Sequence, residues 1–253
     1  HIVMLCNTHA DPEQEAEYLK MVVSRQVDGV IVASSMLAPA QLTTLIGPDQ
    51  PWVHIGPGMG EACRNLCYIN YEEGAYQMTT HLIKMGQTEI ALLLDEAPLT
   101  EMKQMTEGYR RALREQLPGA GECILTEQDS PHGGFLITQR LLQYDALPPA
   151  MITASSGQAS GVLQALQGEG IPVPEQMALA CLSDSATCSI LEPPLTALES
   201  PNKRLGMVAA RMLFDIIEDN GEEGYGPQEV ILQPKLKIRR SCGNTKPIYE
   251  LFG

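Results

Sequence analysis

Short apolar runs alternate with amphipathic stretches along most of the chain, and this alternation predicts the fold class. Runs such as 27–34 and 51–56 are mostly apolar and do not alternate with polar residues, which is typical of strands covered on both faces. The stretches between them repeat apolar residues every three or four positions, as in 202–218, which favours helices. We therefore predict an α/β protein with parallel sheets and helices on both faces.

The number of expected strands bears on domain organisation. The strands are expected at 1–7, 27–34, 51–56, 65–70, 89–94, 122–125, 150–154, 177–182, 229–234 and 235–240. The helices are expected at 10–26, 38–46, 72–85, 101–116, 133–144, 157–168 and 202–218. This is too many strands for one modest sheet, so we expect two lobes with a cleft between them.

Three helix boundaries carry specific residues. Asp11 is placed to cap the first helix, and Pro12 suits its first turn. Gly86 suits the position just after a helix end, where a left-handed backbone is common. Ser200 is expected to cap the last long helix, with Pro201 after it.

The run 177–182 ends in the polar cluster Ser183, Asp184 and Ser185. In open parallel sheets, ligands bind outside the carboxyl ends of the strands. Asp184 then faces a ligand cleft, or alternatively it caps a turn or a helix start. The pattern alone leaves both interpretations open.

Charge and composition exclude several functions for this segment. The net charge of −14 is a poor match for a phosphate backbone, so any contact with nucleic acid would be made by another part of the protein. No apolar run approaches the roughly 20 residues that a membrane span requires. The seven cysteines are odd in number and form no C-x-x-C, which indicates reduced thiols and a cytoplasmic protein.

The sequence contains no complete catalytic or metal-binding motif. The five histidines show no metal-ligand spacing, and no nucleophile and base occur as a set. The segment 56–62 resembles part of a dinucleotide fingerprint, but no crossover helix fits before the next apolar run. The S-x-x-K at 200–203 lacks its partner motifs in the right order. We predict no catalytic residue, no metal, no cofactor and no enzyme activity.

Six blocks in sequence order resemble one family, the lactose-repressor/galactose-repressor (LacI/GalR) transcription factors. They include "SRQVDGVIVASS", "YEEGAYQMTTHLIKMGQTEIALL" and "EGYRRAL". The others are "QALQGEGIPVPEQMALACLSDS", "EPPLTALESPNKRLGMVAARMLFDII" and "LQPKLKIRRSC". The resemblance covers about residues 1–242.

The resemblance implies an effector-binding core of the periplasmic-binding-protein type I fold, with two Rossmann-like lobes joined by a hinge of three crossovers. The first lobe would comprise 1–70 and 198–226, without the family's first strand and helix. The second would comprise 71–197 and 227–242, followed by a tail at 243–253. The family's effector binds in the cleft between the lobes.

Partners also follow from the resemblance. Family members form homodimers and bind operator DNA through an N-terminal helix-turn-helix headpiece, which is missing from this segment. We expect a small-molecule effector, a sugar or a related metabolite. The expected effector-binding residues are Ser34, Asn70, Ser155, Ser156, Ser183 and Asp184, with Asp129 as a weaker candidate.

The sequence departs from the sugar-binding members of the family at four positions. Where they carry Arg or Asp, this chain has Met105, Ser156, Ser183 and Gly56. These charged groups form the hydrogen bonds that select sugar hydroxyls. The departures disfavour a neutral sugar and leave a smaller, more apolar or differently charged ligand, or no ligand at all, as the alternatives.

Three functions are compared. The leading one is the ligand-sensing core of a LacI-type regulator that changes the DNA affinity of its headpiece. The alternative is a periplasmic-type solute-binding protein of a transporter, which shares the fold but would need export. An enzyme is the third, and turnover of a bound metabolite would identify it.

Overall fold

The computed structural model describes residues 2–9, 11–33, 35–57, 65–97, 99–218 and 228–243. The chain divides into two compact units. The first unit contains His1–Ile69 and Pro201–Leu232, and the second contains Asn70–Ser200 and Gln233–Gly253.

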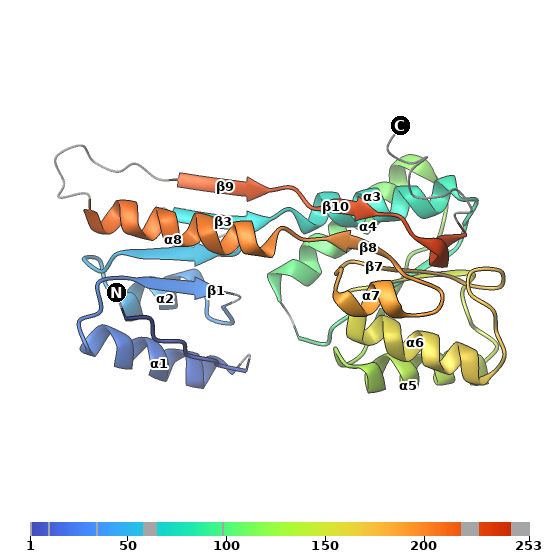
Figure 1. Ribbon diagram of the computed structural model, residues 1–253, viewed down its shortest axis with the longest axis horizontal. Coiled ribbons are helices and arrows are strands. Elements are labelled where there is room, and N and C mark those ends of the chain that lie inside the picture. The colour runs from blue at the N-terminus through green and yellow to red at the C-terminus, as the bar shows by residue number, and fades with distance from the viewer. Residues whose placement is uncertain are drawn as a thin grey trace. The chain divides into compact units, whose positions relative to one another are not determined.

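The first unit is built on a four-stranded parallel sheet (Figure 1). Its strand order is β1-β2-β3-β9, with bounds Val30–Ala33, Trp52–Ile55, Asn65–Ile69 and Gln228–Leu232. Its helices are α1 (Pro12–Ser24), α2 (Pro39–Ile46) and α8 (Asn202–Glu218). One core cluster joins Leu19, Val32, Leu42 and Ile46, and another joins Val53 and Cys67 to Ala209 and Met212 of α8.

The second unit is built on a six-stranded sheet with the order β10-β8-β7-β6-β4-β5. Its strands are β4 (Ile90–Leu94), β5 (Cys123–Thr126), β6 (Ala150–Thr153), β7 (Ala178–Cys181), β8 (Thr196–Glu199) and β10 (Lys235–Lys237). Its α-helices are α3 (Tyr71–Lys84), α4 (Thr100–Gln116), α5 (Pro131–Gln143), α6 (Ser156–Gly168) and α7 (Ala186–Ile190). All strands run parallel except β10, which pairs antiparallel with β8.

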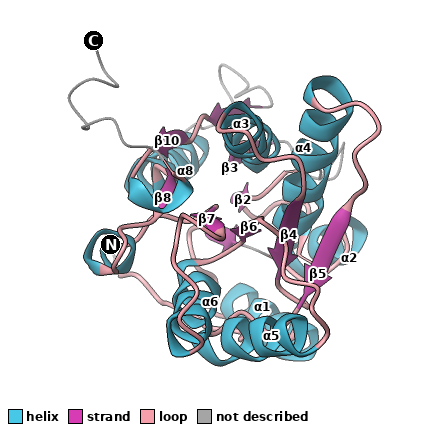
Figure 2. Ribbon diagram, turned by 90° about the vertical axis from the view of Figure 1, so that its right-hand side faces the viewer, coloured by secondary structure: helices cyan, strands magenta, loops and turns pink. Residues whose placement is uncertain are grey.

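Helix pairs cover both faces of the second sheet. Figure 2 shows α3 and α4 on one side of the sheet and α5 and α6 on the other. Met78 of α3 and Tyr109 of α4 belong to one buried cluster. Ile137 of α5 and Leu163 of α6 belong to the opposite one. The predicted α/β class with two parallel sheets is confirmed.

Glycine permits close approach between paired helices in this unit. A Cβ added at Gly161 of α6 would lie 1.8 Å from the carbonyl oxygen of Pro131. A Cβ added at Gly108 of α4 would lie 2.0 Å from the carbonyl oxygen of Glu72. No side chain fits at either distance, so the two helix pairs depend on glycine at these contacts.

Two predicted helix boundaries are confirmed. The Asp11 carboxylate accepts hydrogen bonds from the backbone N–H of Glu13 and Gln14, at 2.9 and 3.3 Å. Gly86 follows the end of α3 with a φ of +96°. These caps fix the start of α1 and the end of α3.

The predicted buried strand at 1–7 is wrong for the residues that the structure describes. Residues 2–8 carry no strand, and Ile2 and Leu5 are 98% and 92% exposed. An apolar run becomes a strand only where a neighbour accepts its backbone hydrogen bonds. None of the described strands pairs with it.

The predicted assignment of 227–232 to the second lobe is also wrong. Strand β9 pairs in parallel with β3 in the first unit, with Tyr68 opposite Ile231. Only after Leu232 does the chain enter the second unit, where β10 joins β8. The two strands are so close in sequence that their apolar pattern does not show this change of sheet.

Three further expectations concern membrane spans, the tail and Ser34. No helix in the described part of the chain has both the length and the apolarity of a membrane span. Most of the expected tail, residues 244–253, lies outside the described residues. Ser34, an expected effector contact, also lies outside them.

Candidate functional site

The carboxyl ends of five parallel strands meet at one edge of the second sheet, and polar residues follow four of them. Ser155 and Ser156 follow β6, and Ser183, Asp184 and Ser185 follow β7. Asp95 follows β4, and Asp129 lies in the loop after β5. We call these seven residues the polar edge. In open α/β sheets this is the side on which ligands bind.

Hydrogen bonds connect the loops of neighbouring strands. Ser155 caps α6 by accepting from the backbone N–H of Gln158 at 3.1 Å, and its hydroxyl donates to the Asp129 carboxylate. The Ser185 hydroxyl donates to the Ser156 hydroxyl at 3.0 Å. The structure therefore brings the predicted residues after β6 and β7 together.

Two carboxylates lie on the β4–β5 side of the polar edge. The backbone N–H of Asp129 donates to the Asp95 carboxylate at 3.2 Å. Neither carboxylate forms an ion pair with a Lys or Arg in the described part of the chain. No direct ion pair among the described residues therefore neutralises these two carboxylates.

The side chain of Gln158 in α6 joins the ends of β4 and β5 by hydrogen bonds. Its side chain is fully buried, and its Nε2 donates to the carbonyl oxygens of Leu94 and Glu127 at 3.1 and 3.0 Å. Its Oε1 has no hydrogen-bond partner among the described residues. Sequence analysis did not select this glutamine, because a single polar residue in the first turn of a helix carries no distinctive signal.

Asp184 is held by an ion pair. Arg239 Nη2 lies 3.0 and 2.9 Å from the two carboxylate oxygens, and Lys237 Nζ lies 3.4 Å from one of them. The side chains of Asp184 and Arg239 are only 9% and 14% exposed. Ser185, not Asp184, occupies the N-cap position of the helix that follows, and the Asp184 carboxylate bonds Arg239 and Lys237 instead, so the interpretation of Asp184 as a helix cap is not supported. Most of its charge is neutralised within the unit.

The sequence Arg239-Arg240-Ser241, which follows β10, is held against the sheet by hydrogen bonds. Arg239 Nη1 donates to the carbonyl oxygen of Leu195 at 2.5 Å. The buried Ser241 hydroxyl donates to the carbonyl oxygen of Leu179 and accepts from the backbone N–H of Thr196. In the sequence this motif supports the family resemblance, but nothing in it indicates the contact with Asp184. The contact joins residues 55 positions apart.

Asn70 has a local structural role. It caps α3 by accepting from the backbone N–H of Glu73 at 3.0 Å. It is the first residue of the second unit. No hydrogen bond between described residues joins it to the serines that follow β6 and β7.

The thiols of Cys181 and Cys188 both contact the backbone of Ser183. Cys181 ends β7, Cys188 lies in α7, and both are fully buried. Burial raises the pKa of the Cys181 thiol. A hydrogen bond with Cys181 lowers the pKa of the Cys188 thiol. The two neighbouring thiols therefore differ in acidity.

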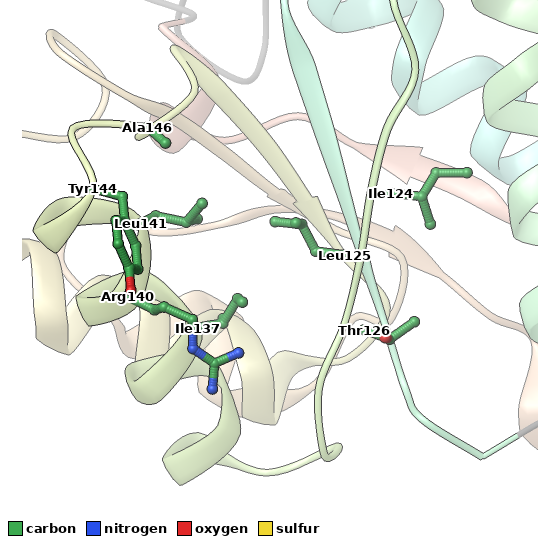
Figure 3. Close-up of a pocket in the computed structure, with 8 residues that line it drawn as sticks. All are labelled: Ile124, Leu125, Thr126, Ile137, Arg140, Leu141, Tyr144 and Ala146. Atoms are coloured by element: carbon green, nitrogen blue, oxygen red, sulfur yellow. The ribbon is translucent and has the colours of Figure 1, made fainter.

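Two grooves occur in the second unit. One of about 280 Å³ adjoins the polar edge and is lined by Leu94, Asp95 and Thr126 together with Met102, Lys103 and Arg110 of α4. The other, of about 400 Å³, lies between β5 and α5 (Figure 3). It is lined mainly by Ile124, Leu125, Ile137, Leu141 and Tyr144, and contains none of the predicted site residues.

Comparisons with known proteins agree with this architecture. A model of the periplasmic binding protein-like domain matches residues 79–242. The HTH-type transcriptional repressor PurR of Actinobacillus pleuropneumoniae is 31% identical over 243 residues, which are 96% of this chain and 72% of the repressor. The chain belongs to the LacI family of transcriptional regulators.

Solved structures of LacI-family regulators are similar. CcpA of Lactococcus lactis superposes with a TM-score of 0.79 at 27% identity, over 94% of this chain and 86% of CcpA. A LacI family regulator from Enterococcus faecium with bound ribose has a TM-score of 0.78 at 25% identity, over 89% of this chain and 83% of that protein. The family resemblance predicted from the sequence is confirmed. The LacI family consists of transcriptional regulators and is non-enzymatic.

Proposed function

We propose that the polar edge of the second sheet binds a small-molecule effector of this regulator. The observation that carries the proposal is the hydroxyl pair of Ser156 and Ser185, 3.0 Å apart at the ends of adjacent strands. Beside it lie the carboxylates of Asp129 and Asp95. Acceptors and hydroxyls at the carboxyl ends of parallel strands suit recognition of a small polar molecule.

The charge of the polar edge constrains the effector. Carboxylates without a direct ion pair accept hydrogen bonds from a ligand, so the effector is a donor of hydroxyl or amino groups. Met105, which stands where sugar-binding relatives carry Arg, is 4% exposed and packs into the core. The absence of that Arg side chain favours a cationic or amino-bearing metabolite over an anionic one.

The effector acts on DNA binding through its differential affinity for two states of the protein. We propose that the whole regulator is a cytoplasmic homodimer that contacts operator DNA through a helix-turn-helix domain. A coupling of about 1–3 kcal/mol, or roughly 5- to 150-fold in DNA affinity, is typical of such regulators. The acidic segment described here would sense the ligand and leave DNA contact to that domain.

Isothermal titration calorimetry of the chain tests the proposal. Ribose, cellobiose and a set of amino-bearing metabolites are titrated into the wild-type chain and into Ser156→Ala. We expect one small molecule to bind and the variant to weaken its binding about tenfold. Ser189→Ala is the control, because this exposed α7 hydroxyl bonds only the Ala186 carbonyl oxygen. Equal binding by Ser156→Ala and wild type would contradict the proposal.

A second step tests the coupling to DNA. Full-length regulator is assayed for operator binding with and without the metabolite identified by calorimetry. We expect operator affinity to change at least fivefold. An unchanged affinity would show that the molecule is not an effector.

A further inference from the structure

Two thiols converge on one carbonyl oxygen at the end of β7. Cys181 Sγ donates to the Ser183 carbonyl oxygen at 3.0 Å, and Cys188 Sγ donates to the same oxygen at 3.6 Å. Both are free cysteines, and each affects the pKa of the other. Both sulfurs therefore lie next to the same oxygen atom, and movement of the short helix α7 can bring them to bonding distance.

The environments of the two thiols give them different roles. The neighbouring Cys181 and groups of Ser185 lower the pKa of the Cys188 thiol, whereas burial raises the pKa of the Cys181 thiol. The thiolate is the nucleophilic form of cysteine. Cys188 therefore suits the first attack on an oxidant, and Cys181 suits the later attack on the oxidised sulfur.

The short helix α7 offers a route of access to Cys188. It has five residues, of which Cys188 alone is buried. Its N-cap, Ser185, makes no side-chain capping bond. Short helices without capping bonds open locally at low cost. Such an opening would expose Cys188 while β7, buried in the sheet, keeps Cys181 in place.

We propose that Cys181 and Cys188 are a peroxide-sensitive pair that forms a reversible disulfide. The Cys188 thiolate attacks one peroxide oxygen, which breaks the O–O bond and gives a sulfenic acid and one water after protonation. Cys181 then attacks the Cys188 sulfur, which forms the S–S bond and releases the second water. The two thiols lose two electrons and two protons, and hydrogen peroxide is reduced to two waters.

The disulfide would rearrange the segment that carries Ser183, Asp184 and Ser185. An S–S bond of about 2.05 Å requires the two Cβ atoms to lie about 3.8 Å from each other. Formation of the bond would therefore draw α7 toward the end of β7. The Ser183 carbonyl oxygen would lose both thiol donors. An effect on effector binding rests on the proposed function, whereas formation of the disulfide does not.

Mass spectrometry of the full chain tests the pair directly. The reduced chain is treated with hydrogen peroxide, free thiols are alkylated, and chymotrypsin cleaves at Leu182 between the two cysteines. We expect a cross-linked peptide that joins Cys181 to Cys188 and is lost after dithiothreitol. In Cys181→Ala, dimedone should label Cys188, because the sulfenic acid there has no partner. The control Cys123→Ser, which removes an exposed thiol, should keep the disulfide.

Two outcomes would overturn the proposal. One is that both cysteines stay reduced at a peroxide concentration that oxidises Cys123. The other is that dimedone labels Cys181 in Cys188→Ser as fast as it labels Cys188 in Cys181→Ala, because Cys188 would then have no preference as the first nucleophile. Hydrogen exchange of peptides within 182–190 should also change on oxidation, and unchanged exchange would contradict the rearrangement. None of these measurements involves an effector, so their failure is distinct from failure of the proposed function.

Discussion

The Arg239 guanidinium contacts both carboxylate oxygens of Asp184, at 2.9 and 3.0 Å, with little of either side chain exposed. Loss of one partner of a buried ion pair costs about 3–5 kcal/mol, and without Arg239 the Asp184 carboxylate keeps the longer, more exposed contact with Lys237. We predict that Arg239→Gln lowers the free energy of unfolding of the second unit by about 3 kcal/mol. Urea denaturation followed by hydrogen exchange of β7 and β8 peptides measures this change.

The neighbouring arginine provides the control. Arg240 pairs with Glu192 at 2.8 Å, but these side chains are 63% and 77% exposed. Exposed pairs contribute less than about 1 kcal/mol because water screens them. Arg240→Gln should therefore be nearly neutral. If both variants lost stability equally, the ion pair of Asp184 would not be the cause.

Close packing of α5 against α6 leads to a second prediction. Gly161→Ala places a methyl group against the Pro131 carbonyl oxygen, so the helices must separate, at a cost of about 1–3 kcal/mol. Gly168→Ala lies at the end of the same helix with nothing within 4 Å of the added Cβ, so we expect unchanged or higher stability. Thermal unfolding by circular dichroism measures both variants. A stable Gly161→Ala would contradict the packing described above.

His54 makes the stability of the first unit depend on pH. Burial lowers its pKa from 6.5 to about 4, and its Nδ1 has no hydrogen-bond partner among the described residues. Between these values the unfolded chain binds a proton that the folded chain does not, so stability falls as pH decreases from about 6.5 to about 4. One pKa unit corresponds to about 1.4 kcal/mol, so the total loss is a few kcal/mol.

Trp52 lies two residues from His54 in β2 and is the only tryptophan, so its fluorescence reports unfolding of the first unit. We predict that urea midpoints measured by this signal decrease as the pH falls from 6.5 to 4. In His54→Gln, the contribution of His54 to the decrease of the urea midpoint should disappear. An equal slope in wild type and variant would assign the pH dependence to other groups.

Much of the fold could be predicted from local pattern. The helices α3, α4, α6 and α8 were located to within about a residue, because their apolar spacing is long and regular. The strand β8 was missed, because its apolar run is interrupted by Thr196 and preceded by two prolines. The five-residue helix α7 has one buried residue and therefore shows no period.

Less of the site was predictable. Serines after β6 and β7 were found, because strand ends in parallel sheets identify them. The ion pair of Asp184 was missed, because its partners come from the end of the chain and only folding brings them near. The thiol pair was missed for a related reason, since only the path of the chain from β7 into α7 brings both sulfurs to the Ser183 carbonyl oxygen.

Hydrogen–deuterium exchange of the chain, with and without the metabolite found by calorimetry, tests the central claim most directly. We predict that the bound metabolite slows exchange in peptides covering 155–158 and 183–186, at the carboxyl ends of β6 and β7. Protection confined to 137–146, at the apolar groove beside β5, with no change at the polar edge, would contradict it.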